Sequence, residues 1–166
     1  MGEHLWSFVP YEIAPDVVTL GKPMGNGYPV AAVVTRREIV ERFPFAGRVF
    51  STFGGNPVAA RAALAVLDVI EDERLVTHAK RVGEVLIAAL RELRSPEIVE
   101  VRGRGLLVGV QLTGPEVTAR VVDRLRETGI LIGLTGPRDD VLKIRPPLVF
   151  DEEHAATLAD GLRRVL

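Results

Sequence analysis

The chain has 166 residues, enough for one ordinary domain or two small lobes with a real hydrophobic core. Its 47% hydrophobic and 26% charged residues are typical of a soluble globular protein, and 21 Lys+Arg against 22 Asp+Glu lack the basic surplus of nucleic-acid-binding proteins. The absence of cysteine excludes disulfides, thiolate nucleophiles and most structural zinc sites.

The first third of the chain combines short apolar runs with turn-rich segments. Residues 17–20 form a β-branched run that ends at Gly21 and predicts a buried strand. Three glycines and two prolines fall within residues 21–29, which predicts a turn-rich loop rather than helix or regular strand. A second apolar strand is expected at residues 30–34, followed by a short helix that Thr35 caps and that continues to about Phe43.

Two helices are predicted after a loop at residues 44–57. The first covers residues 57–71, with Pro57 in its first turn and an alanine-rich face that permits close packing. The second covers residues 75–93, with apolar residues at helical spacing, and Ser95-Pro96 ends it.

The last part of the chain alternates strands and helices. Strands at residues 98–102 and 106–112 are joined through Gly103-Arg104-Gly105 as a hairpin, and a helix at residues 115–128 stops at Gly129. Strands at residues 130–132 and 141–144 and a closing helix at 151–166, capped by Asp151, follow. This order predicts a small α/β lobe, separable from the part before Pro96.

Lys22 stands out chemically because it follows an expected buried strand within a glycine-rich loop. A lysine whose stem is held by backbone can be desolvated, which lowers its pKa from about 10.4 and makes the neutral amine a nucleophile. That chemistry suits condensation with an aldehyde cofactor. By spacing alone, an ordinary solvent-facing loop lysine is the commoner explanation.

Four segments in order resemble class III pyridoxal-phosphate aminotransferases, and they cover nearly the whole chain. Residues 15–30 are similar to the cofactor-lysine segment, and Ser51-Thr52-Phe53-Gly54-Gly55-Asn56-Pro57 to a second hallmark of the family. Residues 102–112 resemble the family's glycine-containing hairpin. Leu142-Lys143-Ile144-Arg145-Pro146-Pro147-Leu148 resembles its substrate-arginine strand, in a form that favours the alanine–glyoxylate-like branch.

The resemblance implies an α/β chain that is part of a fold-type I pyridoxal-phosphate transferase. Residues 1–72 would be the C-terminal portion of the large cofactor domain, residues 73–95 a linking helix, and residues 96–166 the small C-terminal α/β domain. It also implies a homodimer with the site at the interface. No stretch approaches the roughly 20 apolar residues of a membrane helix, and the first residues lack the basic start and apolar run of a signal peptide, so a cytoplasmic location is expected.

The resemblance also assigns roles to three residues. Lys22 would form a Schiff base with pyridoxal 5′-phosphate and then move a proton as general acid and base. Thr52 would donate a hydrogen bond to the cofactor phosphate of the neighbouring subunit, and Arg145 would clamp a substrate carboxylate. Without the resemblance, Thr52 reads as a turn residue and Arg145 as a cation on a solvated strand edge. The three histidines lie far apart and predict no metal site.

The implied activity is transfer of an amino group between an amine or amino acid and a 2-oxo acid. The family's phosphate loop, ring-stacking aromatic and ring-nitrogen aspartate lie upstream of the lysine segment, so the isolated chain is expected to bind the cofactor weakly and not to be a competent transaminase. Two alternatives stay open: a pyridoxal-phosphate-dependent phospho-lyase of the same family, and a non-catalytic dimerisation module derived from an aminotransferase.

Overall fold

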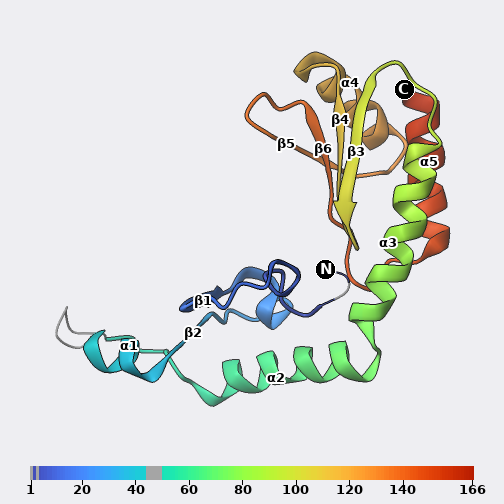
Figure 1. The fold of residues 1–166 in the computed structure, drawn as a ribbon. Helices are drawn as coiled ribbons and strands as arrows, with labels where there is room; N and C mark the ends of the chain where they lie inside the picture. Colours follow the sequence, from blue (N-terminus) through green and yellow to red (C-terminus); the bar gives the residue numbers. More distant parts are fainter. Residues whose placement is uncertain (1, 3, 44–49) are drawn as a thin grey trace. The chain divides into compact units, whose positions relative to one another are not determined.

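The computed structural model of the chain describes residues 2, 4–43 and 50–166 (Figure 1). These residues form two compact units. The N-terminal unit is Ser7–Arg74, and the C-terminal unit combines Leu75–Leu166 with the described residues before Ser7. The domain limits expected near residues 72 and 96 concern a longer protein and stay a prediction. Among the described helices, none has both the length and the apolar character needed to cross a membrane.

The N-terminal unit is built from two short strands, one longer helix and several single turns (Figure 1). Its elements are η1 (Val9–Tyr11), β1 (Val17–Leu20), η2 (Lys22–Gly25), β2 (Ala32–Thr35), α1 (Arg37–Arg42) and α2 (Pro57–Asp72). The predicted strand at 17–20 and helix at 57–71 are confirmed, and residues 21–29 contain one 3-10 turn instead of being loop throughout.

The expectation that the strand at residues 17–20 is buried is wrong for this chain. β1 and β2 pair with each other in antiparallel register, from Val17 opposite Thr35 to Leu20 opposite Ala32. Val17, Val33 and Val34 are 48%, 64% and 54% exposed. A two-stranded ribbon buries neither face unless another layer covers it, and the described residues supply no such layer. Apolar side chains of both β1 and β2 are therefore exposed.

The turn between β2 and α1 also differs from the prediction. Thr35 is the last residue of β2, not a helix cap, and its hydroxyl donates a 2.7 Å hydrogen bond to the Asp16 carbonyl oxygen. α1 begins at Arg37 without a side-chain cap. Arg36 instead forms an ion pair of 2.6 Å with the Asp16 carboxylate. The Thr35 hydroxyl therefore bonds to the residue that precedes β1 and does not cap α1. Residues 44–49 of the predicted loop lie outside the described residues.

Helix α2 buries only a narrow stripe of its surface. Asn56 caps it by accepting a 2.9 Å hydrogen bond from the Ala59 amide, and Ala59 and Ala63 are its buried residues. The alanine face permits close packing, as predicted, and α2 contacts η2. Four larger apolar side chains on the helix are exposed: Val58, Leu64, Leu67 and Val69. A helix that is apolar on several faces is typical of one covered by further protein.

The C-terminal unit is a four-stranded antiparallel sheet with helices, in the strand–strand–helix–strand–strand–helix order predicted (Figure 1). After α3 come β3, β4, α4, β5, β6 and α5, and the sheet order is β3-β4-β6-β5. The bounds are α3 (Leu75–Arg91), β3 (Ile98–Arg104), β4 (Leu107–Leu112), α4 (Pro115–Glu127), β5 (Gly133–Thr135), β6 (Val141–Ile144) and α5 (Glu152–Val165).

One face of this sheet carries the core. Val108 lies opposite Ile144 and Val110 opposite Leu142, and all four are buried. The core continues into α3, α4 and α5 through Leu86, Leu90, Val121, Leu125 and Leu162. The apolar residues that alternate along β4 therefore meet the apolar stripes of the three helices, as binary patterning requires.

The strand predicted at residues 130–132 forms three residues later, at β5. Gly129 has a φ of +87° and ends the α4 segment, and the Ile130 amide donates to the Leu125 carbonyl oxygen at 2.9 Å. Ile130 and Ile132 pack against the core instead of joining the sheet. Their apolar character is used for packing, whereas pairing with β6 begins only at Gly133.

Asp151 caps α5 as predicted, and this cap makes a pH-dependent contribution to the stability of the folded chain. The Asp151 carboxylate accepts a 2.9 Å hydrogen bond from the His154 amide, which lowers the pKa of Asp151 from its usual value. A carboxyl with a lowered folded-state pKa adds stability above its unfolded-state pKa, and that stability is lost as pH falls through the folded-state value. We expect thermal unfolding of Asp151→Asn to respond less to a change from pH 6 to pH 3 than that of the parent chain.

The matched control for this cap is Glu153→Gln, which removes a carboxylate from the first turn of the same helix without touching the cap. It should keep the acid sensitivity of the cap. An equal loss of acid sensitivity in both variants would show that total charge, not the Asp151 cap, is responsible.

Candidate functional site

Lys22 lies at the first position of η2, directly after β1 and Gly21. Its φ of +51° is in the left-handed region, which is uncommon for a residue with a side chain and frequent at functional sites. The side chain is exposed, and within the described residues it makes no ion pair or hydrogen bond. The structure thus presents a primary amine on a fixed turn, without the burial that the sequence suggested.

The turn after Lys22 is held by consecutive backbone hydrogen bonds. The Met24 amide donates to the Gly21 carbonyl oxygen at 3.2 Å, and the Asn26 amide to that of Pro23 at 2.9 Å. Gly25 is buried, and a Cβ there would lie 2.6 Å from Val30 Cγ1, so only glycine fits without movement. The backbone therefore sets the direction in which the lysine leaves the chain.

Thr52 lies in the exposed loop that leads into α2. This loop turns at Gly54 and Gly55, and the Asn56 side-chain amide donates a 2.8 Å hydrogen bond to the Phe53 carbonyl oxygen. Gly55 has a φ of +72°. Two aromatic side chains beside Thr52, Phe50 and Phe53, are 88% and 80% exposed. Because α2 contacts η2, the loop that carries Thr52 leads into the helix that supports the Lys22 turn.

Arg145 follows β6 in the C-terminal unit. It is exposed, makes no ion pair or hydrogen bond within the described part of the chain, and lines a pocket of about 400 Å³. Lys143, His154 and Thr157 line the same pocket. Lys22 and Thr52 therefore share one unit and Arg145 belongs to the other, so their convergence into one site stays a prediction.

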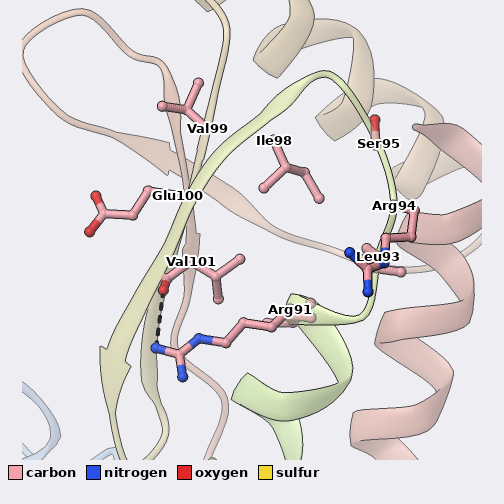
Figure 2. Close-up of a pocket in the computed structure, with 9 residues that line it drawn as sticks. Arg91, Leu93, Arg94, Ser95, Ile98, Val99, Glu100 and Val101 are labelled. Atoms are coloured by element: carbon pink, nitrogen blue, oxygen red, sulfur yellow. Dashed lines mark hydrogen bonds between the residues drawn. The ribbon is translucent and has the colours of Figure 1, made fainter.

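A second pocket of about 470 Å³ lies beside the edge strand β3 (Figure 2). It is lined by the end of α3, the turn after it and the first half of β3, and the Arg91 guanidinium donates to the Val101 carbonyl oxygen at 3.5 Å. β3 and β5 are opposite edges of the sheet, so this pocket is separate from the one that Arg145 lines. No motif in the sequence pointed to it, since its lining is an ordinary mixture of apolar and charged residues.

The groups available for chemistry in these two units are the Lys22 amine, the Thr52 hydroxyl and the side chains of Lys143 and Arg145, two cations that form no ion pair among the described residues. No cluster of three or more His, Cys, Asp or Glu side chains suited to a metal ion occurs in residues 2, 4–43 and 50–166. An amine can condense with an aldehyde, and a hydroxyl and a guanidinium can bind phosphate and carboxylate. These donors fit a phosphorylated aldehyde cofactor such as pyridoxal phosphate and an anionic substrate.

Comparison with known proteins identifies a family whose chemistry agrees with these groups. The family model described as aminotransferase class-III matches residues 2–166. A Caenorhabditis elegans protein named ethanolamine-phosphate phospho-lyase homolog 1 is 38% identical over all of this chain, and an Arabidopsis thaliana protein named alanine–glyoxylate aminotransferase 2 homolog 2, mitochondrial, is 40% identical over 96% of it. The chain spans 38% and 35% of the lengths of these two relatives.

The fold is also found in solved structures. A phospholyase from Arthrobacter in complex with phosphoethanolamine matches with a TM-score of 0.92 and 40% sequence identity, over 97% of this chain and 40% of that one. The match extends through both units, from the strands beside Lys22 to the closing helix.

Proposed function

Because the chain belongs to the class III aminotransferase family and has part of the fold-type I architecture of pyridoxal-phosphate transferases, we propose that it is the lysine-bearing and C-terminal part of an amino-group transferase. The complete enzyme would move an amino group between an amine or amino acid and a 2-oxo acid. The family uses pyridoxal phosphate, and the chain covers about two fifths of its relatives' length. The activity would therefore require the longer protein.

The observation that carries this proposal is the geometry of Lys22. Its amine is unpaired within the described residues, and its left-handed backbone is fixed by the turn that follows. When bound, the cofactor would supply an aldehyde that condenses with this amine and a ring that accepts electrons from the substrate carbon. Once the substrate amine had displaced it from the aldehyde carbon, the freed Lys22 amine would take the proton from the substrate carbon and donate it to that former aldehyde carbon.

Thr52 and Arg145 would serve binding and orientation. We propose that the Thr52 hydroxyl donates to the cofactor phosphate of a second copy in a homodimer, a role that its exposed loop permits. The apolar side chains exposed around it and on α2 support burial against further protein. Arg145 would hold the substrate carboxylate through a two-pronged contact, for which a planar guanidinium is suited.

The chain has three lysines, which makes the proposal easy to test. We expect incubation with pyridoxal phosphate, borohydride reduction and peptide mapping to place the pyridoxyl group preferentially on Lys22. The label on that peptide should vanish in Lys22→Ala and persist in the control Lys80→Ala. Equal labelling of Lys22, Lys80 and Lys143 would contradict the proposal and favour the dimerisation module.

A phospho-lyase is the second candidate, because two of the proteins that the chain resembles are named for that activity or bind phosphoethanolamine. The longer enzyme would then release phosphate from ethanolamine phosphate without an amino acceptor, whereas a transaminase requires the acceptor. The cytoplasmic location expected from the sequence stays a prediction, and the Arabidopsis relative is named as a mitochondrial protein.

A further inference from the structure

A tight turn in the N-terminal unit has an asparagine followed by a glycine at its centre. The Tyr28 amide donates to the Gly25 carbonyl oxygen at 3.0 Å, which closes a four-residue turn. The central residues are Asn26, with φ 45° and ψ 49°, and Gly27, with a φ of +107°. Positive φ at both central residues defines a type I′ turn, for which Asn-Gly is the preferred pair.

Both groups that could react within this pair are free. The Asn26 side chain is exposed and forms no hydrogen bond with any residue that the structure describes. The Gly27 amide likewise donates to no acceptor in the described part of the chain. A Cβ at Gly27 would meet nothing within 4 Å, so the space around this residue is open. An exposed amide without an acceptor is accessible to water and base.

An asparagine side chain and the next backbone nitrogen are held close enough to react within one chain. The Gly27 nitrogen would lose its proton to base and attack the side-chain carbonyl carbon of Asn26. A new C–N bond forms there, the bond to the side-chain nitrogen breaks, and ammonia leaves. Water then opens the resulting five-membered imide at either of its two carbonyl groups, which gives aspartate or isoaspartate. Base and water are the only co-reactants.

The turn permits this attack after one local rotation. With ψ at 49°, the Gly27 nitrogen lies on the opposite side of the Asn26 Cα–C bond from Cβ. A type II′ turn keeps a positive φ at its first central residue but has a ψ of about −120° there, which brings the next nitrogen alongside Cβ. The change rotates only the peptide group between Asn26 and Gly27, and Gly27 has no Cβ to oppose it. Both turn types keep the hydrogen bond from Tyr28 to Gly25.

We propose that Asn26-Gly27 is a site of spontaneous deamidation, at which the chain converts its own asparagine to isoaspartate or aspartate. The product lies at the end of η2, the turn that begins with Lys22. Either product adds a negative charge, and isoaspartate also adds one carbon to the main chain. The Lys22 turn would therefore change irreversibly with time. This inference does not rest on the proposed transferase function, because the reaction requires no cofactor.

The chain has two asparagines, and the second is an internal control. Asn56 precedes Pro57, whose nitrogen carries no hydrogen and cannot attack. The Asn56 side chain is also held at both ends: it donates to the Phe53 carbonyl oxygen at 2.8 Å and accepts from the Ala59 amide at 2.9 Å. We expect Asn56 to keep its amide under conditions in which Asn26 loses its own.

The test keeps the folded 166-residue chain in buffer near pH 8 and follows it over days by peptide mapping. The peptide that contains Asn26 should gain about 1 Da, since an NH₂ group is replaced by OH, and the peptide that contains Asn56 should not change. A protease that cleaves before aspartate should leave a large part of the product uncut, because isoaspartate is not its substrate. Asn26→Gln should stay unmodified over the same period, since its longer side chain does not form the five-membered ring.

A synthetic peptide with residues 21–31 gives the rate of the same pair without the fold. We expect the folded chain to react within about tenfold of the peptide's rate, since the turn permits the rotation. The amide resonances of Lys22 and Gly25 should shift as product forms, whereas that of Leu142 in the C-terminal unit should not. Circular dichroism establishes that the chain stays folded throughout.

An intact Asn26 in the folded chain after the peptide has reacted would overturn the proposal, because the turn would then protect the pair. Aspartate without isoaspartate would also overturn it, since direct hydrolysis of the side chain does not pass through the imide. An equal change at Asn56 would have the same meaning.

Discussion

Lys22→Ala in the longer enzyme is expected to lower kcat for amino transfer by about a thousandfold or more. A positioned general acid and base contributes typically about 10²- to 10⁴-fold, and loss of covalent attachment of the cofactor adds to this. Steady-state transfer from an amino acid to a 2-oxo acid measures the effect, with Lys80→Ala as the control at an exposed position on α3.

The variant also separates the chemical role of Lys22 from a structural one. Its backbone is in the left-handed region, where alanine is at least as strained as lysine, so alanine offers no conformational relief. Circular dichroism and thermal unfolding should therefore be close to those of the parent protein. If small primary amines added to the assay partly restore turnover, the missing group is the amine. Near-normal kcat in Lys22→Ala would reject Lys22 as a catalytic residue.

Gly83→Ala is expected to destabilise the C-terminal unit by about 3 kcal/mol, in spite of the helix propensity of alanine. Gly83 lies in the middle of α3 and is fully packed against the β3–β4 hairpin. A Cβ at this position would lie 2.5 Å from Gly105 Cα, with the Gly105 carbonyl group still nearer. Because the neighbour is backbone and not the end of a flexible side chain, either the helix or the hairpin must move.

The hairpin has little freedom to give way. Gly105 has a φ of +52° at the tip, and a Cβ at Gly103 would lie 2.6 Å from the Leu107 carbonyl oxygen. A Cβ at Gly2 would also lie 3.2 Å from Gly105 Cα. The tip is thus approached closely by both Gly83 and Gly2, and the approach of Gly83 leaves no room for a Cβ.

Chemical denaturation of Gly83→Ala measures the predicted loss, since the midpoint should fall at an unchanged m-value. Gly114→Ala is the matched control. Gly114 is the N-cap of α4 with extended backbone, and a Cβ there meets nothing within 4 Å, so this variant should lose only the cap preference of glycine over alanine, about 1 kcal/mol or less. Equal stability of Gly83→Ala and the parent would mean that α3 and the hairpin tip are farther apart in solution.

Sequence patterns predicted the order of elements in the C-terminal unit because those patterns are local. Apolar spacing marked α3, the glycines marked the hairpin, and Asp151 marked the start of α5. The same reasoning misplaced β5 and gave Thr35 to a helix cap. In both cases a tertiary contact decided the outcome. Ile130 and Ile132 pack against the core, and the Thr35 hydroxyl donates a hydrogen bond to the Asp16 carbonyl oxygen.

The sequence by itself determined the family, through four ordered segments that include Lys22, Thr52 and Arg145, since side-chain chemistry at fixed spacing needs no coordinates to be recognised. Only the tertiary structure decided that β1 and β2 are exposed and that Lys22 has a left-handed backbone. It also decided that Gly83 contacts the hairpin tip. The physical reason is that burial and close packing depend on segments far apart in the chain, whereas helix, strand and turn preferences depend on near neighbours.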